Sequence, residues 1–212
     1  MSVLAKICGL SSEEAIAAAL LGGAAYLGFV FYPKSPRAVG AERAARLAAA
    51  IPKGVCRVGL FVDAADEAIG AILDEAPLDL LQLHGGESPE RVEDLKRRFG
   101  LPVMKAVRIA GEDDVAAAER FEGVADLLLF DAKAPRGALP GGNGLLFDWR
   151  LLAGHSWRRP WMLSGGLNAE LLPEAVRVSG ASLVDVSSGV ESAPGKKDPS
   201  KIRAFLEAAR AL

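Results

Sequence analysis

Short apolar segments alternate with alanine- and charge-rich segments along the whole sequence, and each pair takes up about 25 residues. The apolar segments have the composition of buried strands, and those between them have helical periodicity. Eight pairs can be counted in the 212 residues. We predict strands at residues 3–8, 26–31, 56–62, 78–84, 103–109, 125–131, 161–164 and 183–187, and helices at 12–21, 41–50, 65–75, 89–99, 112–121, 147–152 (a weak one), 169–178 and 199–211.

Strict alternation of strands and helices predicts a parallel sheet that is buried on both faces. Eight such units in a chain of this length match a minimal (β/α)8 barrel. We therefore predict an α/β protein with one TIM-barrel domain over residues 1–212. The alternative is a doubly wound open sheet. The barrel is favoured because no GxGxxG follows the first strand, and because polar residues end many strands instead of gathering at one switch point.

The composition indicates a protein that acts on a small molecule. Its 25 Lys and Arg residues and 27 Asp and Glu residues are spread along the chain, so no basic stripe indicates nucleic-acid binding. No apolar run reaches membrane-spanning length, and the N-terminus does not resemble a signal peptide. The cysteines, Cys8 and Cys56, are too few for a disulfide framework and lie in no metal-binding motif. We expect a cytoplasmic protein with no metal, membrane or nucleic-acid partner.

Polar residues stand near the ends of the predicted strands, where a barrel of this kind places its active site. Because side chains alternate along a strand, polar residues two positions apart share one face. Such pairs are Lys6 with Cys8, Gln82 with His84, and Asp185 with Ser187. Lysine, glutamine and aspartate are costly inside a small barrel unless they are paired or hydrogen-bonded. The pairs therefore predict a polar site at the barrel mouth.

Two glycine-bearing loops follow the seventh and eighth predicted strands: LSGGLN at 163–168 and VDVSSGVE at 184–191. Glycine lets the backbone approach an anion closely, and consecutive N–H groups supply donors. Two such loops at adjacent strands predict a phosphorylated ligand. The predicted phosphate-binding residues are Gly165, Gly166, Ser187, Ser188 and Gly189. The alternative is that Gly165 and Gly166 only form a tight turn before a helix capped by Asn168.

The motifs KICGL, GFVFYPKSPR (28–37), RVGLFVD (57–63), LLQLHGGE (80–87), LLLFDAKAP (127–135), GGNGLLFDW (141–149), LSGGLN and VDVSSGVESAPGKKD occur in this order from Lys6 almost to the C-terminus. Together they resemble the phosphoribosylanthranilate isomerases of the tryptophan pathway. The resemblance implies an Amadori rearrangement that needs no metal or organic cofactor. Its substrate would be N-(5'-phosphoribosyl)anthranilate, and its product 1-(o-carboxyphenylamino)-1-deoxyribulose 5-phosphate.

The resemblance also implies a general base and a general acid, which are Cys8 and Asp131 in this sequence. Opening the furanose needs a proton at the ring oxygen, and enolisation needs a proton removed from C2'. Asp131 must then be protonated when the substrate binds. Cys8 needs its thiolate, which Lys6 and a helix start capped by Ser11, with Glu14 as its partner, would favour.

Each of these residues also has a purely structural interpretation. Cys8 could be an inert buried thiol, as we expect for Cys56. Asp131 could instead pair with Lys133 or cap the next element. His84 could be a core histidine that is satisfied by a backbone carbonyl.

The remaining site residues are assigned to substrate binding. Arg37 lies in the proline-stiffened PKSPR loop, and its guanidinium matches the anthranilate carboxylate, although it could be a solvated surface charge. Asp185 could orient Lys6 or Cys8, or form a structural ion pair. The full predicted set is Lys6, Arg37, Gln82, His84 and Asp185 for the substrate, with Gly142 added to the phosphate site. The glycine run at 141–144 suggests a mobile lid.

The sequence departs from the family pattern at Leu145 and Leu146, where many members have a basic and a polar residue. Backbone N–H groups or another residue would then replace that basic contact. Two rival functions are the related aminoaldose isomerase of histidine synthesis, which usually has an aspartate where this chain has Cys8, and a non-catalytic sugar-phosphate-binding barrel. Both a monomer and a homodimer are compatible with the sequence.

Overall fold

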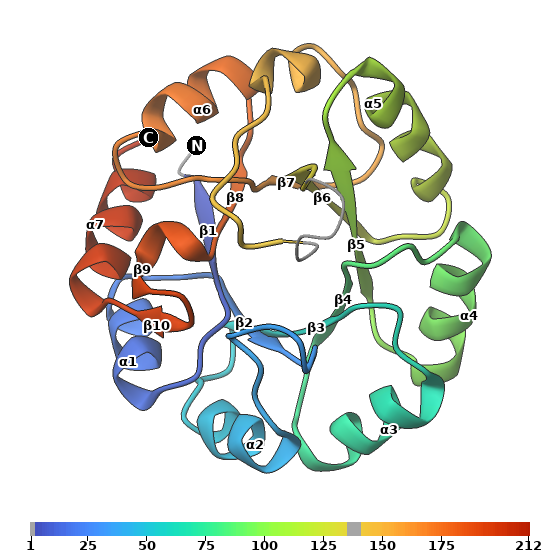
Figure 1. The fold of residues 1–212 in the computed structure, drawn as a ribbon, viewed down its shortest axis with the longest axis vertical. Coiled ribbons are helices and arrows are strands. Elements are labelled where there is room, and N and C mark those ends of the chain that lie inside the picture. Colours follow the sequence, from blue (N-terminus) through green and yellow to red (C-terminus); the bar gives the residue numbers. More distant parts are fainter. Residues whose placement is uncertain (1–2, 135–140) are drawn as a thin grey trace.

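The computed structural model describes residues 3–134 and 141–212, and its strands form a closed barrel (Figure 1). The eight parallel strands pair in chain order, and β1 pairs with β8 to close the ring. The strands are β1 (Leu4–Cys8), β2 (Tyr26–Val30), β3 (Cys56–Phe61), β4 (Leu80–Leu83), β5 (Val103–Ile109), β6 (Leu127–Ala132), β7 (Trp161–Leu163) and β8 (Leu183–Val186). The predicted (β/α)8 barrel is confirmed, and the open sheet was the wrong alternative.

Helices surround the barrel on its outer side (Figure 1). They are α1 (Glu13–Leu21), α2 (Ala41–Ala49), α3 (Asp66–Glu75), α4 (Pro89–Phe99), α5 (Glu112–Ala118), α6 (Leu172–Ser179) and α7 (Pro199–Arg210), with short 3-10 turns η1 (Glu119–Phe121), η2 (Trp149–Leu152) and η3 (Ser188–Val190). A small antiparallel hairpin of β9 (Glu191–Ala193) and β10 (Lys196–Lys197) lies between β8 and α7.

Three local predictions were wrong. The weak helix at 147–152 is only the 3-10 turn η2. The N-cap of α1 is Ser12, whose side chain accepts from the Ala15 N–H, so Ser11 is not the cap. Asn168 accepts from the N–H groups of Glu170 and Leu171, and this turn delays the start of α6 until Leu172.

The barrel interior changes from apolar to polar along the strands. One buried cluster fills the amino-terminal part of the interior with side chains that include Val58, Leu80, Met104, Leu129 and Met162. A larger apolar cluster packs the outward faces of the strands against the helices. Side-chain alternation sends Ala5 and Ile7 into the outer cluster, whereas Lys6 and Cys8 face inward as predicted. The polar inner residues are therefore confined to the carboxyl ends of the strands.

No helix within residues 3–134 and 141–212 is long and apolar enough to cross a membrane.

Phe205 on α7 offers a test of the outer packing, because it is fully buried where α7 lies against α1 and β1. We expect Phe205→Ala to lower the free energy of unfolding by about 3–5 kcal/mol, since it leaves a cavity. The matched control is Glu207→Ala on the exposed side of the same helix, which should change it by less than about 0.5 kcal/mol. Urea unfolding followed by circular dichroism measures both, and equal losses would contradict this packing.

Candidate active site

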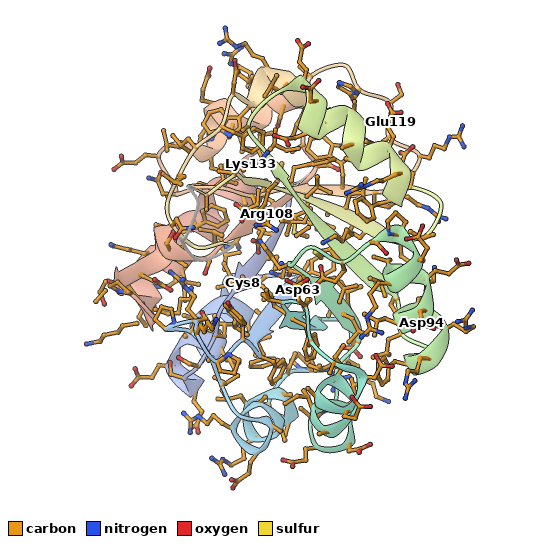
Figure 2. The ribbon with its side chains drawn as sticks, turned by 45° about the vertical axis from the view of Figure 1, so that its right-hand side comes forward. Cys8, Asp63, Asp94, Arg108, Glu119 and Lys133 are labelled. Atoms are coloured by element: carbon orange, nitrogen blue, oxygen red, sulfur yellow. The ribbon has the colours of Figure 1, made fainter. Side chains whose placement is uncertain are left out.

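Two adjoining pockets open at the carboxyl ends of the strands. The main pocket is lined by polar side chains, Cys8, Arg37, Gln82, His84 and Asp131 among them, and by apolar ones, Val30, Tyr32, Leu60 and Val62. The glycine pocket is lined by the 141–145 segment, by 164–167 and by 185–188. Six residues belong to both pockets: Asp131, Gly141, Gly142, Ser164, Asp185 and Ser187. Figure 2 shows Cys8 and Arg108 near the middle of the molecule and Asp94 and Glu119 at its edge.

A buried ion pair forms the floor beneath the main pocket. The Lys6 Nζ donates to Asp185 Oδ1 at 2.8 Å, and Ser164 Oγ donates to the other oxygen, Oδ2, at 2.9 Å. Burial alone would lower the pKa of Lys6, but Asp185 and the neighbouring Cys8 together raise it. Lys6 is therefore charged at physiological pH. It lies beneath the pocket, next to Cys8, and is not one of the lining residues.

Cys8 lies between this floor and the pocket. Burial raises the pKa of the Cys8 thiol, although the positive charges of Lys6 and Lys197 act to lower it and Asp185 adds to the rise. Lys6 therefore acts in the direction that we expected, but burial outweighs it. On the neighbouring strand Gly28 stands opposite Cys8, where a Cβ would lie 3.1 Å from Sγ and 3.2 Å from Lys6 Nζ.

Asp131 is held at the end of β6 by two contacts. The Ala132 N–H donates to its Oδ1 at 2.9 Å, and its Oδ2 lies 3.1 Å from Nε2 of His84. The His84 Nδ1 is in turn 2.9 Å from the amide nitrogen of Gln82. Lys133 does not pair with Asp131, because it binds Asp114 instead. The structure therefore joins Gln82, His84 and Asp131 into one buried chain of hydrogen bonds.

Arg37 is buried, so it is not a solvated surface charge. Its Nε and Nη2 donate to the two oxygens of Glu191, each at 2.8 Å, and Nη2 also donates to the Gly142 carbonyl at 3.2 Å. Its Nη1 has no hydrogen-bond partner among the residues that the structure describes. Arg37 is one of the residues that line the main pocket.

The glycine pocket contains most of the predicted phosphate residues. Gly165 and Gly166 have φ angles of 88° and 64°, which glycine adopts without strain. Their N–H groups donate to no other residue within the described part of the chain. Gly142, Ser187 and Ser188 also line this pocket. Gly189 does not line it, because it packs against the Leu167 carbonyl.

The segment after residue 141 runs across the barrel opening (Figure 1). A Cβ at Gly141 would lie 2.9 Å from Nε2 of His84, so only glycine allows this close approach. Leu145 and Leu146 are 38% and 50% exposed, and their apolar side chains can supply no basic contact.

Several residues around the pockets escaped the sequence analysis. Glu191, Lys197 and Gly28 contact predicted site residues, as does Ser164, which lies in the predicted LSGGLN loop but was given no role of its own. For Glu191 and Lys197 the available signal was the charged part of VDVSSGVESAPGKKD. Within residues 3–134 and 141–212, no three His, Cys, Asp or Glu side chains are grouped so that they could hold a metal ion.

Fold and pockets together define a (β/α)8-barrel protein in which a main pocket with Cys8, His84 and Asp131 in its lining adjoins a glycine-lined pocket at the carboxyl ends of the strands. The model of the N-(5'-phosphoribosyl)anthranilate (PRA) isomerase family matches residues 5–208. The chain therefore belongs to the PRA isomerase family.

Individual relatives match over nearly the whole chain. The N-(5'-phosphoribosyl)anthranilate isomerase of Cereibacter sphaeroides is 61% identical and the alignment covers 98% of this chain and 99% of that protein. The crystal structure of the phosphoribosylanthranilate isomerase from Thermotoga maritima is 38% identical, with a TM-score of 0.89 and coverage of 99% and 100%. A further isomerase structure, in complex with reduced 1-(o-carboxyphenylamino)-1-deoxyribulose 5-phosphate, is 36% identical, with a TM-score of 0.87 and the same coverage.

The contact between Gly28 and Cys8 can be tested by Gly28→Ala. The added methyl group would press on Sγ and on the Lys6 ammonium. We expect a loss of about 1–3 kcal/mol, or a fall in Tm of about 2–12 °C. Gly123→Ala, at a position with open space around it, is the control and should leave Tm within about 2 °C. Differential scanning calorimetry measures both, and an unchanged Tm for Gly28→Ala would contradict the close approach.

The state of the Cys8 thiol in the free enzyme can be measured by its alkylation rate as a function of pH, in a Cys56→Ser background. The rate follows the thiolate fraction, so a raised pKa moves the half-maximal rate to a pH above that of an ordinary thiol. A midpoint near neutral pH would show that Lys6 and Lys197 outweigh burial. The companion variant Cys8→Ser reports on Cys56, whose pKa burial raises to about 11.

Proposed function

We propose that this chain converts N-(5'-phosphoribosyl)anthranilate into 1-(o-carboxyphenylamino)-1-deoxyribulose 5-phosphate, the third step of tryptophan synthesis from chorismate, and that Cys8 and Asp131 carry out its proton transfers. The observation that carries the assignment of roles is that both residues line one pocket, which adjoins a pocket of glycine N–H groups. The relative bound to the reduced product supports the same substrate class.

In the proposed reaction Asp131 gives a proton to the furanose ring oxygen as the C1'–O bond breaks and the nitrogen lone pair forms the C1'=N bond, which leaves an open-chain protonated imine. Cys8 then removes the proton from C2', and the electron pair moves to form the enol with an amine at C1'. Tautomerisation of this enol returns a proton to C1' and leaves a ketone at C2'. The product has the same atoms as the substrate, so no oxidant or reductant is needed.

The hydrogen-bond chain behind Asp131 is compatible with a protonated acid. If the proton of Asp131 is on Oδ2, this O–H donates a hydrogen bond to Nε2 of His84, and the ring hydrogen of His84 is then on Nδ1. The Gln82 amide must then turn its oxygen toward Nδ1. In the present orientation the Gln82 Oε1 is buried and has no hydrogen-bond partner among the described residues. Turning the amide therefore costs Oε1 no hydrogen bond and brings it to His84 Nδ1. We infer that Gln82 and His84 support the substrate site through Asp131.

The two ends of the substrate fit the two pockets. We propose that the sugar phosphate binds the N–H groups of Gly165 and Gly166 with Ser187 and Ser188 nearby, since these donors need no cationic side chain. The anthranilate ring would lie beside Val30, Leu60 and Val62 in the main pocket. Its carboxylate would accept a hydrogen bond from the free Nη1 of Arg37. If the hydrogen bond from Nη2 to the Gly142 carbonyl breaks, Nη2 would donate to the carboxylate as well, and the contact would be bidentate.

The test follows the loss of anthranilate-type fluorescence after addition of freshly made phosphoribosylanthranilate. We expect Cys8→Ser and Asp131→Asn each to lower kcat by about 10²–10⁴-fold, because each removes a proton-transfer group. Cys56→Ser is the matched control and should keep the wild-type rate. Equal rates for all variants would overturn the assigned roles, and no turnover by the wild type would overturn the function.

A further inference from the structure

The β9–β10 hairpin carries charged residues that the proposed function has not used. Its sequence, ESAPGKK, folds back at Gly195, which has a φ of 80°. Glu191 and Lys197 are both buried, at 8% exposure each, whereas the neighbouring Lys196 is exposed. A buried charge is unfavourable unless it has a partner, so the contacts of Glu191 and Lys197 show what these two charges do.

Glu191 is the residue that fixes Arg37. Its two carboxylate oxygens accept from Nε and Nη2 in the parallel geometry that gives the strongest arginine–carboxylate contact. Oε2 also accepts from the Gly195 N–H at 3.2 Å. Because one edge of the guanidinium is held in this way, only Nη1 and the shared Nη2 face other groups. Glu191 therefore sets the direction in which Arg37 presents its free edge.

Lys197 connects this ion pair to the glycine pocket. Its Nζ donates to Glu191 Oε1 at 2.8 Å, to the Ser187 carbonyl at 2.9 Å and to Ser187 Oγ at 3.2 Å. Ser187 Oγ in turn donates to the backbone carbonyl of Cys8 at 3.2 Å. One ammonium group therefore contacts both Glu191, which holds Arg37, and Ser187, which is one of the six residues that line both pockets.

The charges of this cluster leave an excess that an anionic ligand would balance. Two buried cations, Arg37 and Lys197, share the single carboxylate of Glu191. Burial would raise the pKa of Glu191, but hydrogen bonds from Arg37 and the charge of Lys197 lower it, so the carboxylate is ionised. Burial lowers the pKa of Lys197 and the charge of Glu191 acts against that fall. With Lys197 protonated, the cluster carries a net charge of +1, and its Arg37 lines the main pocket.

We propose that Glu191 and Lys197 are positioning residues for substrate binding: Glu191 orients the Arg37 guanidinium toward the substrate carboxylate, and Lys197 holds Glu191 and Ser187 at a fixed separation. The hairpin would thereby set the distance between the carboxylate end and the phosphate end of the ligand. This inference rests on the proposed function, because it takes the role of Arg37 from there.

A double-mutant cycle on product binding tests whether Glu191 acts through Arg37. The dissociation constant of the product is measured by fluorescence titration for the wild type, Arg37→Ala, Glu191→Gln and the double variant. We expect Glu191→Gln to weaken binding by about tenfold when Arg37 is present and by less than about twofold in the Arg37→Ala background. The same fold-change in both backgrounds would overturn the inference, since a merely structural role predicts additive effects.

Circular dichroism shows whether each variant folds. If Glu191→Gln does not fold, because it leaves two buried cations without a carboxylate, Glu191→Asp replaces it in the cycle. That variant keeps the charge but cannot reach both nitrogens of Arg37, so the same expectation applies. Product binding that is unchanged by Arg37→Ala would also overturn the inference. A wild type without turnover would overturn the proposed function instead, while the binding cycle would still be readable.

Lys197→Met and Lys196→Met form a matched pair on one strand, one buried and one exposed. We expect Lys197→Met to weaken binding of both the product and inorganic phosphate by about fivefold or more, and to raise KM more than it lowers kcat. Lys196→Met should change each constant by less than about twofold. Equal effects of the two substitutions would overturn the role of Lys197.

Discussion

The buried ion pair between Lys6 and Asp185 is the contact on which the rest of the site depends. It joins β1 to β8 at the point where the barrel closes, and the two residues stand in register with each other. An ammonium group with no exposed surface needs its carboxylate, because either charge alone would be strongly unfavourable in the interior. Removing one partner would therefore disturb barrel closure and the electrostatic environment of Cys8 together.

The site above this pair is made possible by small residues at points of close approach. Gly28 leaves room for Sγ of Cys8 and for Lys6 Nζ, and Gly141 allows the crossing segment to lie directly on His84. In a close-packed interior a single added methyl group at such a point lowers stability, because the neighbouring side chains have no free space to move into. Glycines at these contacts therefore help to position Cys8 and His84, in addition to the hydrogen bonds of the site.

Five parts of the chain that are far apart in sequence meet around the ligand pockets. Arg37 and Glu191 are 154 positions apart, and the cluster that they form with Lys197 reaches Ser187 and the backbone of Cys8. On the other side, Gln82 and His84 from the fourth strand region reach Asp131. Each proton-transfer candidate thus has its own neighbouring group of buried polar residues, and members of both groups line the main pocket.

The sequence by itself determined the barrel, because strand and helix periods repeat eight times and parallel strands need both faces covered. Strand alternation also sufficed to place Lys6 and Cys8 together on the inner face. The position of the two glycine loops directly after strands seven and eight placed them at the barrel mouth. Only the tertiary structure decided that Arg37 is buried against Glu191, that Gly189 lies outside the glycine pocket, and that burial outweighs Lys6 at the thiol. Those outcomes depend on distances between loops and on exclusion of water, and local periodicity contains neither.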